Sequence, residues 1–478
     1  MNFLRLHDPL LSILFENEDI IAIDKPYGFN AHTNDSKIEH SDFIQDGLIE
    51  IFEKNLNCKL HIIHRLDQTT TGVMIFGKSP ESAKKYAEYF FDRKVQKTYL
   101  FITKSISQKN TFEINQMIIH KGKELDALTD LRLMDKNSGF ELWQALPHTG
   151  RNHQIRIHAQ FAEIPILGDE KYTGADYPFL CLHNCKIEFP NGVIIESKPP
   201  EYFKNLNILN NKQRAKIIFE IDRRQRLFSL ADQQQCLRLV HHKNKFKNQD
   251  FTMDQFGEKQ ITQPSEPTEN QAWIAIDNKI KFELKADAKN NVGLFTNQRL
   301  QRNWVLKNSE NKNVLNLFSH TGTYGVCAAA GSASSVTSVD LNKNNLNWSR
   351  RNFEINHISQ DAHKFLLRDS ALYIEQCAIK NLKFDLIVCD APSFYRREKG
   401  IFKIENEMTA LIKNCLSCLN PNGHLLFSTT ADDLYIDQIK QIILSTIKNV
   451  EINCILPSMD FEFPDEKSNL KSFLIQLK

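Results

Sequence analysis

The chain is 478 residues long, and because a domain usually holds about 100 to 200 residues, this length predicts two or three domains and excludes a single small module. Hydrophobic residues make up 41% and charged residues 25%, with no stretch of about 18 uncharged apolar residues, so we expect a soluble globular protein that does not cross a membrane. The formal net charge is only +2, so composition alone does not indicate a nucleic-acid-binding protein.

The amino terminus and the cysteines indicate a cytoplasmic protein. Residues 1–20 include Asp8, Glu16 and Glu18, where a signal peptide requires a basic start and an unbroken apolar run. The 10 cysteines are scattered through the chain, which favours reduced thiols over a disulfide framework.

The pattern of apolar runs changes along the chain. Residues 1–205 alternate short β-rich runs with turns, which favours a mixed, largely antiparallel sheet; the runs include IIAIDKP, TGVMIFG, KTYLFIT and CKIEFP. Residues 286–478 instead hold buried-strand runs separated by helical stretches, which is typical of a doubly wound parallel sheet; these runs are VLNLF, SVTSVD, FDLIVCD and GHLLFST.

Residues 206–285 form an expected intermediate region with a basic helix and a small β-rich part. Within residues 211–250, ten Lys or Arg side chains stand against four Asp or Glu, so the local net charge is +6. The polar, proline-containing stretch 261–271 is expected to be a loop or linker.

The first motif is HIIHRLDQTTTG at 61–72, in which an apolar run leads to Asp67 and a threonine-rich turn. It resembles the HRLD motif of the RluA-type pseudouridine synthases. Further motifs of that family stand in the same order, so the resemblance covers nearly all of residues 12–200; they are IIAIDKPYG, FDRKVQKTYL, HTGRNHQIRIHAQ and IPILGDEKYTG. The resemblance implies an α+β pseudouridine synthase fold that needs no cofactor.

The resemblance also implies a role for several side chains. Isomerising uridine breaks the bond from N1 to the ribose and rejoins the base through C5, so a carboxylate must act at the sugar, and the motif assigns this to Asp67. Arg156 keeps that carboxylate ionised, and Tyr99 stacks on the base and helps to remove the C5 proton. The expected RNA contacts come from Arg65, Lys97 and Arg151. The alternatives are a structural Asp67–Arg156 ion pair, a core Tyr99 and a solvated Lys97.

The second motif is VLNLFSHTGTYGVCAAAG at 314–331, which predicts a strand, a turn and the start of a helix. Asp340, Asp369 and Asp390 each follow a later predicted strand, and ligands of such sheets bind beyond the carboxyl ends of the strands. The series resembles the class I S-adenosylmethionine methyltransferases (Rossmann-like α/β fold), specifically the RlmI/RlmK type that acts on large-subunit rRNA. A nicotinamide dinucleotide is disfavoured, because the turn is poor in phosphate-cradling glycines.

By that resemblance Asp340 binds the cofactor ribose and Asp369 lies near the adenine, while Asp390, with Pro392 and Phe394, faces the target base. The first turn supplies further expected cofactor contacts, which are Ser319, Thr321 and Gly322. The alternatives are that Ser319 or Thr321 caps a helix and that Phe394 belongs to the core.

The chain departs from that family at Ala391, where the family has proline, and at Asn297, where it has aspartate. Methylation of cytosine C5 requires a cysteine nucleophile, and Thr429 stands at that position. Cys389 is expected to point away from Asp390 by strand alternation. A purine nitrogen is therefore the favoured target. Cys415 and Cys418 are expected to be core thiols, without a metal site.

These observations predict a bifunctional enzyme that forms pseudouridine and methylates a base in RNA, with rRNA favoured over tRNA and with S-adenosylmethionine as the methyl donor. The alternative is an active pseudouridine synthase whose methyltransferase-like half is a non-catalytic RNA-binding module. We expect the basic segment to bind RNA through Arg223, Arg224 and Arg226, and a solvated helix face is the other interpretation.

Overall fold

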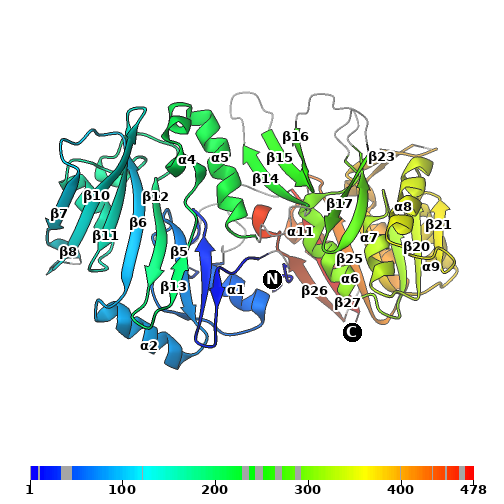
Figure 1. The fold of residues 1–478 in the computed structure, drawn as a ribbon. Helices are drawn as coiled ribbons and strands as arrows, with labels where there is room; N and C mark the ends of the chain where they lie inside the picture. The colour runs from blue at the N-terminus through cyan, green and yellow to red at the C-terminus, as the bar shows by residue number, and fades with distance from the viewer. Residues whose placement is uncertain are drawn as a thin grey trace. The chain divides into compact units, whose positions relative to one another are not determined.

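The structure is a computed structural model, and it groups the chain into two compact units, one of residues Leu10–Ala231 and one of residues Met1–Pro9 with Asp232–Lys478 (Figure 1). The residues that the structure describes are 2–8, 11–33, 46–120, 122–228, 236–242, 251–263, 272–285, 292–398, 400–432, 434–446, 449–461 and 469–477. Most of the expected linker at 261–271 lies outside these residues.

The unit of residues 10–231 is built on a ten-stranded mixed sheet, counted over the described residues. Its strands in spatial order are β2 (Phe15–Glu16), β3 (Ile20–Lys25), β5 (Thr71–Gly77), β12 (Leu182–Glu188), β6 (Gln96–Thr103), β11 (Phe140–Pro147), β10 (Leu128–Asn137) and β7 (Thr111–Asn115), with β4 (His61–Ile62) on β5 and β13 (Ile194–Glu196) on β12. The pair β12–β5 is parallel and the other pairs are antiparallel. The expected largely antiparallel sheet is therefore confirmed.

Helices cover this sheet and close its core. They are α1 (Leu48–Leu56), α2 (Pro80–Phe91), α3 (Gln154–Phe161), α4 (Glu201–Lys204) and α5 (Lys212–Gln225), with 3-10 turns η1 (Glu170–Tyr172) and η2 (Leu206–Asn210) and a hairpin of β8 (Ile118–His120) and β9 (Lys123–Leu125). Helix α2 starts sharply because Ser79 caps it and Pro80 takes its first position, where no backbone donor is needed.

Helix α5, the expected basic helix, packs into the core of this unit. Its Ala215 and Phe219 belong to a hydrophobic cluster with Tyr177, Phe179 and Tyr202. The rings of Phe179 and Phe219 stack with centroids 4.3 Å apart. The helix therefore belongs to the unit of residues 10–231, whereas the strands that follow it belong to the other unit.

The second unit holds an eight-stranded sheet with the parallel order expected from the sequence. Its strands in spatial order are β21 (His363–Leu367), β20 (Ser335–Asp340), β19 (Asn313–Leu317), β22 (Phe384–Ala391), β25 (Leu419–Thr429), β27 (Lys471–Leu477), β26 (Val450–Ile455) and β1 (Asn2–Leu4). The five strands from β21 to β25 are parallel, and β27 runs antiparallel to both of its neighbours. The prediction of a doubly wound sheet is confirmed.

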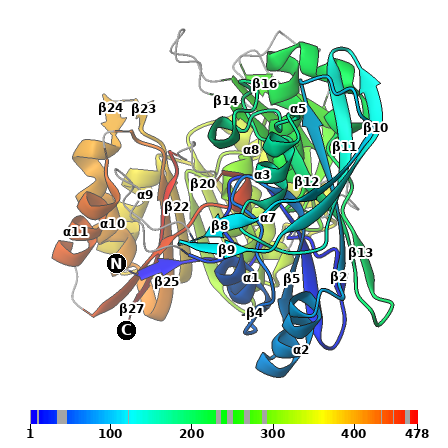
Figure 2. The same cartoon turned by 90° about the vertical axis from the view of Figure 1, so that its left-hand side faces the viewer.

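Helices and small sheets cover the two faces of this sheet, and Figure 2 shows α9, α10 and α11 together on one side. The helices are α6 (Arg299–Lys307), α7 (Thr323–Ala330), α8 (Lys343–Ile355), α9 (Ser370–Ile379), α10 (Ile404–Ser417) and α11 (Ile436–Thr446), with 3-10 turns η3 (Thr296–Gln298) and η4 (Met459–Phe461). The small sheets are β14 (Cys236–His242) with β15 (Phe251–Phe256) and β16 (Lys259–Gln263), β17 (Trp273–Asp277) with β18 (Ile280–Leu284), and β23 (Phe394–Arg396) with β24 (Ile401–Lys403). None of the helices in the described ranges is long and apolar enough to span a membrane.

The amino terminus of the chain belongs to the second unit, in contrast to the expected division at residue 205. Strand β1 pairs in parallel with β26, with Asn2 opposite Asn453 and Leu4 opposite Ile455. The other unit is therefore inserted between β1 and the rest of this sheet. Three strand residues are too few to show a periodic pattern in the sequence.

Candidate active sites

The carboxylate of Asp67 lies in the loop between β4 and β5, beside the guanidinium group of Arg156 from α3. Arg156 Nη1 donates to Asp67 Oδ2 at 3.2 Å. The same guanidinium group donates to both carboxylate oxygens of Asp169, at 2.7 and 2.8 Å. Asp169 also caps η1. The structure thus brings Asp67 and Arg156 together and adds Asp169, which fixes the arginine bidentately.

Two further side chains complete the surroundings of this pair. The ring of Tyr172 lies 5.1 Å from the Arg156 guanidinium carbon, and its hydroxyl is hydrogen-bonded to His153 Nδ1 at 2.9 Å. His153 Nε2 lies 3.7 Å from Asp67 Oδ2. Burial lowers the pKa of His153, against the opposing field of Asp67, so the imidazole is held neutral near neutral pH.

Lys25 and Tyr99 lie near Asp67 from the sheet side. The Lys25 ammonium group is fully buried and donates to the carbonyl oxygens of Pro26, Gln68 and Thr70. Burial lowers the pKa of Lys25 to about 7, although Asp67 opposes the shift. Burial also raises the pKa of Tyr99, with a smaller contribution from Asp67, so this hydroxyl stays protonated. Lys25 therefore ties β3 to the loop that carries Asp67.

The expected RNA contacts of this unit differ in exposure. Arg65 is exposed and lies in the same loop as Asp67. Lys97 donates to the carbonyl oxygen of Thr149 at 2.9 Å, and burial lowers its pKa to about 8. Arg151 Nε donates to the carbonyl oxygen of Asp126 at 2.9 Å. Arg65 thus presents its charge to solvent, whereas Lys97 and Arg151 are bonded to backbone.

The prediction that Arg223, Arg224 and Arg226 meet phosphates is wrong, because all three side chains are buried and ion-paired. Arg223 and Arg224 each pair with Glu220 at 2.7 Å. Arg226 pairs with Asp222 at 2.7 Å and with Asp24 at 2.8 Å. The charge count included Glu220 and Asp222 but did not show that they pair with these arginines, and it omitted Asp24. The alternative of a solvated helix face fails for the same reason.

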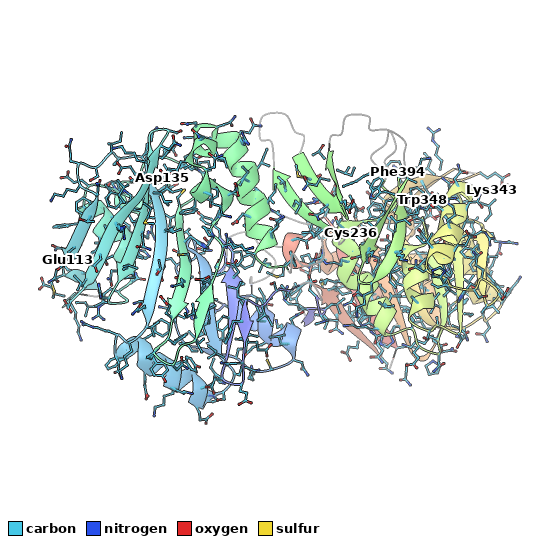
Figure 3. All side chains as sticks on the ribbon, viewed as in Figure 1. Glu113, Asp135, Cys236, Lys343, Trp348 and Phe394 are labelled. Atoms are coloured by element: carbon cyan, nitrogen blue, oxygen red, sulfur yellow. The ribbon has the colours of Figure 1, made fainter. Side chains whose placement is uncertain are left out.

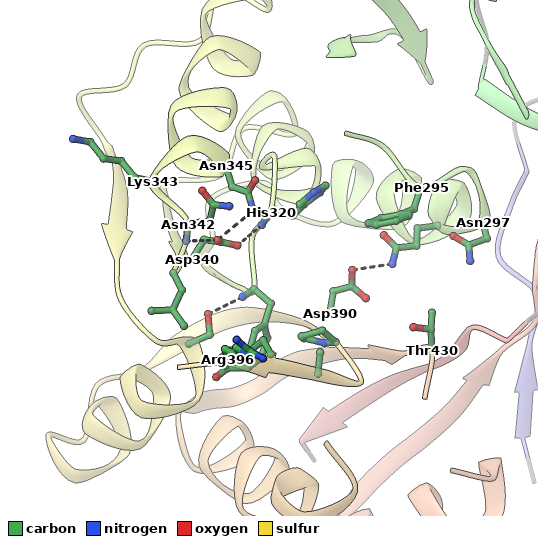
Figure 4. A pocket seen from close by; sticks show the side chains of 17 residues that line it. Phe295, Asn297, His320, Asp340, Asn342, Lys343, Asn345, Asp390, Arg396 and Thr430 are labelled. Carbon is green, nitrogen blue, oxygen red and sulfur yellow. Dashed lines mark hydrogen bonds between the residues drawn. The ribbon is translucent and has the colours of Figure 1, made fainter. Parts of the chain in front are cut away.

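The second site is a pocket of about 680 Å³ at the carboxyl ends of the parallel strands (Figure 4). Its walls come from the ends of β20 and β22 and from the segments after β19, β21 and β25; the residues that line it are Phe295, Asn297, Gln298, Phe318, His320, Asp340, Leu341, Asn342, Lys343, Asn345, Ser370, Asp390, Ala391, Pro392, Tyr395, Arg396 and Thr430. The volume and the mixture of aromatic and polar walls are those of a small-molecule site.

Asp340 lines this pocket at the end of β20, as expected. Its Oδ2 accepts from the backbone N–H of His320 and its Oδ1 from that of Asn342, each at 2.8 Å (Figure 4). Burial raises the pKa of Asp340, against these hydrogen bonds. A carboxylate has about four acceptor positions, so Asp340 retains capacity for ligand hydroxyls.

The turn after β19 contacts the pocket through other residues than those expected. Phe318 and His320 line the pocket, and both have positive φ angles, of 53° and 49°. Ser319 and Thr321 are buried, and neither they nor Gly322 line the pocket that the described residues form. A Cβ atom on Gly322 would lie 1.9 Å from Ser349 Oγ. The glycine thus permits close packing of α8. Phe318 and His320 are the residues of this turn that line the pocket, and the cofactor contacts of Ser319, Thr321 and Gly322 stay predictions.

Asp369 does not line the described pocket either, because its carboxylate caps α9. Its Oδ1 accepts from the backbone N–H groups of Ala371 and Leu372 and from the hydroxyl of Tyr395 at 2.9 Å. Tyr395 and Ser370 are the neighbours that reach the pocket. Asp369 thus supports this wall of the pocket, and its place near the adenine stays a prediction.

Asp390 lines the pocket at the end of β22, and its Oδ2 accepts from Gln298 Nε2 at 2.8 Å (Figure 4). Burial raises the pKa of Asp390 to about 6, although Gln298 and Arg302 oppose the shift. The departures Asn297 and Ala391 also line the pocket. Gln298 directly follows Asn297 in the sequence, but only the fold shows its contact with Asp390.

The remaining expectations for this strand concern its aromatic and cysteine side chains. Phe394, labelled in Figure 3, is 70% exposed and stands outside the described pocket lining, so it is neither core nor pocket wall. Cys389 is fully buried in the core, whereas Asp390 faces the pocket, as strand alternation predicts. Cys415 and Cys418 are core thiols, as expected. No cluster of three or more His, Cys, Asp or Glu suited to a metal occurs among the described residues.

The pocket has features that fit S-adenosylmethionine. Asp340 offers a carboxylate at the end of the second parallel strand, where ribose hydroxyls are bound in such sheets. The neighbouring walls include the aromatic rings of Phe295 and Phe318. The helix that follows the first strand starts at Thr323, and the turn before it holds one glycine, Gly322, which supports packing. The pocket therefore matches an adenosyl ligand without a pyrophosphate.

The unit of residues 10–231 thus has a mixed, largely antiparallel sheet and a site formed by Asp67, Arg156 and Asp169. The second unit has a doubly wound sheet with a pocket at the carboxyl ends of its parallel strands. Comparison with known families agrees with this division. Residues 19–161 match the model described as RNA pseudouridylate synthase, and residues 258–453 match the model described as S-adenosylmethionine-dependent methyltransferase. The chain joins a domain of the first family to a domain of the second.

Among curated proteins, the ribosomal RNA large subunit methyltransferase K/L of Pseudoalteromonas translucida is 32% identical over 44% of this chain and 29% of that protein. The ribosomal RNA large subunit methyltransferase K of Neisseria meningitidis serogroup B is 35% identical over 35% of this chain and 48% of that protein. The chain thus spans less than half the length of either relative. Among solved structures, human RNA pseudouridylate synthase domain containing 4 is 24% identical with a TM-score of 0.34, over 40% of this chain and 90% of that one.

Proposed function

We propose that the chain is a bifunctional RNA-modifying enzyme. Its first unit isomerises uridine to pseudouridine, and its second unit methylates a base, at a purine nitrogen, with S-adenosylmethionine as donor. The observation that carries the proposal is the pairing of two family matches with two formed sites, the Asp67–Arg156–Asp169 cluster and the pocket of Asp340 and Asp390.

In the first unit, Asp67 acts at the ribose while the bond to N1 breaks and the bond to C5 forms. Arg156 stabilises the ionised carboxylate against the field of RNA phosphates, and Asp169 keeps the guanidinium group in the plane that this contact needs. Tyr99 lies on the sheet side of Asp67 and offers an aromatic face to the base. Arg65 supports the flipped nucleotide from the exposed side of the loop.

In the second unit, the residues of the pocket bind the cofactor and orient the base. S-adenosylmethionine supplies an electrophilic methyl group when it is bound. Asp340 accepts hydrogen bonds from ribose hydroxyls. Gln298 holds Asp390 Oδ2, so Asp390 Oδ1 is left to accept an N–H of the base. A neutral nitrogen nucleophile needs no cysteine, which agrees with Thr429 in β25 and with the core position of Cys389.

The proposed substrate is large-subunit rRNA, and the proposed location is the cytoplasm. The support for rRNA is that two relatives of the second unit are named as large-subunit rRNA methyltransferases. No comparison says which uridine the first unit modifies. Pseudouridine formation in tRNA instead of rRNA is the alternative result of the activity test described below. Neither a metal nor a membrane has a part in the proposal.

A second candidate function is favoured by Asn297 and Ala391, which line the pocket where the resembling family has aspartate and proline. In that case the second unit is a non-catalytic RNA-binding module. Titration of the purified protein with S-adenosylmethionine in a calorimeter distinguishes the two functions. Binding of the cofactor is expected for the methyltransferase, and a protein that does not bind it would contradict the methyltransferase proposal.

Both activities can be measured in one sample. Large-subunit rRNA and tRNA, transcribed with uridine tritiated at C5, are incubated with the protein and with methyl-labelled S-adenosylmethionine. We expect tritium release and methyl incorporation on rRNA. Asp67→Asn should abolish only tritium release, and Asp340→Ala should reduce only methyl incorporation. Loss of both activities in either variant would contradict the assignment of one site to each unit.

A further inference from the structure

The short segment η3 and the first turn of α6 connect the pocket to the amino terminus of the chain. Asn297 and Gln298 line the pocket, and Gln298 donates to Asp390. The next residue, Arg299, points to the opposite side and donates to Asp8 Oδ2 at 2.9 Å. Asn303, one turn later, donates to the carbonyl oxygen of His7 at 3.0 Å. Residues 7 and 8 thus contact helix α6, which starts directly after Gln298, the partner of Asp390.

We propose that the amino-terminal segment, residues 2–8, is a positioning element of the methyl-transfer site, in which Asp8 holds Arg299 and thereby fixes Gln298 against Asp390. The inference rests on the proposed function of the second unit. Asp8 does not line the pocket of the described residues, so it acts through α6 and is a positioning residue.

The contact between Asp8 and Arg299 is fully enclosed by protein. The side chains of Arg299 and Asp460 are 0% exposed and that of Asp8 is 4% exposed. Arg299 also donates to both oxygens of Asp460, at 2.9 and 3.2 Å, and to the carbonyl oxygen of Cys236. A buried guanidinium group needs its carboxylate partners. Removal of the Asp8 carboxylate therefore deprives Arg299 of an ion pair that water cannot replace at this enclosed position. The arginine then shifts toward Asp460.

A shift of Arg299 reaches the pocket because Gln298 is its direct neighbour in the chain. The other anchors of the helix lie one turn away, where Arg302 pairs with Asp277 and donates to the carbonyl oxygen of Phe295. The contact of Arg302 with Phe295 holds the residue before η3, whereas Asp8 and Asp460 hold Arg299 at the start of α6. Gln298 lies between these two fixed points, so the orientation of its amide depends on both.

The amino-terminal segment is itself held in the sheet. Leu4 accepts from the backbone N–H of Leu456 at 2.9 Å, and Arg5 contacts the sulfur atom of Met459 at 3.4 Å. Strand β1 ends at Leu4, residues 5–8 follow it, and the inserted unit begins at Leu10. The segment that positions α6 therefore leads directly into the pseudouridine synthase unit.

The test is a double-mutant cycle on the full chain with Asp8→Asn and Gln298→Leu. We expect Asp8→Asn to lower kcat for methyl transfer at least about threefold, with a smaller change in the dissociation constant of S-adenosylmethionine. In the Gln298→Leu background, the same change should lower kcat by less than about 1.5-fold, because the amide through which Asp8 acts is gone. Equal effects in both backgrounds would show only a loss of stability and would overturn the inference.

Two controls separate this outcome from misfolding. Asp361→Asn makes the same chemical change at an exposed position of the same unit and should leave both constants unchanged. If Asp8→Asn does not fold, Asn303→Ser takes its place, because it removes the contact with His7 while Arg299 keeps its two carboxylates. Its effect on kcat should be smaller than that of Asp8→Asn but should be non-additive with Gln298→Leu in the same way. Additive effects of Asn303→Ser would overturn the inference.

A readout without methyl transfer distinguishes failure of the inference from failure of the proposed function. Hydrogen exchange of the full chain should accelerate in residues 292–307 of Asp8→Asn and remain unchanged in β20. Unchanged exchange at 292–307 overturns the inference, whatever the activity. If the wild-type protein transfers no methyl group, the proposed function fails, and hydrogen exchange alone then decides whether the amino terminus holds α6.

Discussion

Arg226 donates two hydrogen bonds to the carboxylate of Asp24, at 2.8 and 2.9 Å, although 202 residues separate them in the chain. Arg226 stands directly after α5, and Asp24 precedes Lys25, which donates to the loop that carries Asp67. Arg226 thus anchors β3 and the strand end beside the first site. The charges of Arg223, Arg224 and Arg226 are neutralised within the protein.

Arg226→Ala should therefore destabilise the unit of residues 10–231 by about 3 to 5 kcal/mol, because the largely enclosed carboxylates of Asp24 and Asp222, 15% and 18% exposed, lose their ion-pair partner. The measurement is the free energy of unfolding from denaturant titration. Arg214→Ala, at an exposed position of the same helix, is the control and should change stability by less than about 0.5 kcal/mol. An Arg226→Ala protein that is as stable as wild type but binds RNA with a shallower salt dependence would restore the phosphate-binding interpretation.

Asp169→Asn should lower the rate of pseudouridine formation by about 10-fold to 100-fold, because Arg156 loses one charged acceptor and its fixed orientation beside Asp67. Single-turnover tritium release measures this rate. Asp92→Asn, at an exposed ion pair of the same unit, is the matched control. A full rate in Asp169→Asn would mean that Arg156 needs no second carboxylate.

The sequence predicted those parts of the two sites that lie within single motifs. Asp67, Arg156, Asp340 and Asp390 each stand in a recognisable run, and the structure places the first two in contact and the last two in one pocket. Asp169 also stood in a quoted motif. Its role was not predictable, because it arises from a contact with a different element, α3.

The errors have the same physical origin. A count of charges along residues 211–250 contains the arginines and omits Asp24, which comes from the far end of the sequence. The turn at 318–322 was expected to contact the cofactor through its small polar residues. In the fold the side chains of Ser319 and Thr321 are buried, and the two non-glycine residues with positive φ, Phe318 and His320, line the pocket. Neither the direction of a side chain in an irregular turn nor a long-range partner is encoded by a local pattern.

Methyl transfer should decrease as the pH falls below about 6, because burial raises the pKa of Asp390 to that value and the protonated carboxyl no longer accepts the base N–H. Gln298→Leu removes a hydrogen bond that favours the ionised form, so it should move this acid limb to higher pH. The measurement is the initial rate from about pH 5 to about pH 8. An acid limb that stays in place in Gln298→Leu would exclude Asp390 as its origin.

The same group affects stability in the opposite sense. A raised pKa in the folded state means that the folded protein binds this proton more tightly than the unfolded chain, so the stabilisation is present below about pH 4 and is lost as the pH rises through about 6. Asp390→Asn should remove this dependence from the denaturant midpoint of the second unit.

Asp340→Ala should weaken the binding of S-adenosylmethionine by about 1.5 to 3 kcal/mol, which is the usual loss for a hydrogen bond to a charged group. Calorimetry measures this change. Asp361→Asn, at an exposed position of the same unit, is the control and should bind like wild type. An unchanged dissociation constant in Asp340→Ala would mean that the ribose lies elsewhere in the pocket.

Gly322→Ala should destabilise the second unit and weaken cofactor binding, although Gly322 does not line the described pocket. Its φ of 78° costs a side chain about 1 kcal/mol, and the added Cβ would also collide with Ser349 Oγ at 1.9 Å, so α8 must move. Helix α8 begins with Lys343 and Asn345, which line the pocket, and the turn itself carries Phe318 and His320. Gly139→Ala is the control, because Gly139 has a φ of 80° and no atom within 4 Å of the added Cβ. We expect the control to show only the backbone cost and full cofactor affinity. Equal effects of the two substitutions on unfolding, with unchanged affinity in both, would contradict the role of Gly322 in seating α8 beside the pocket.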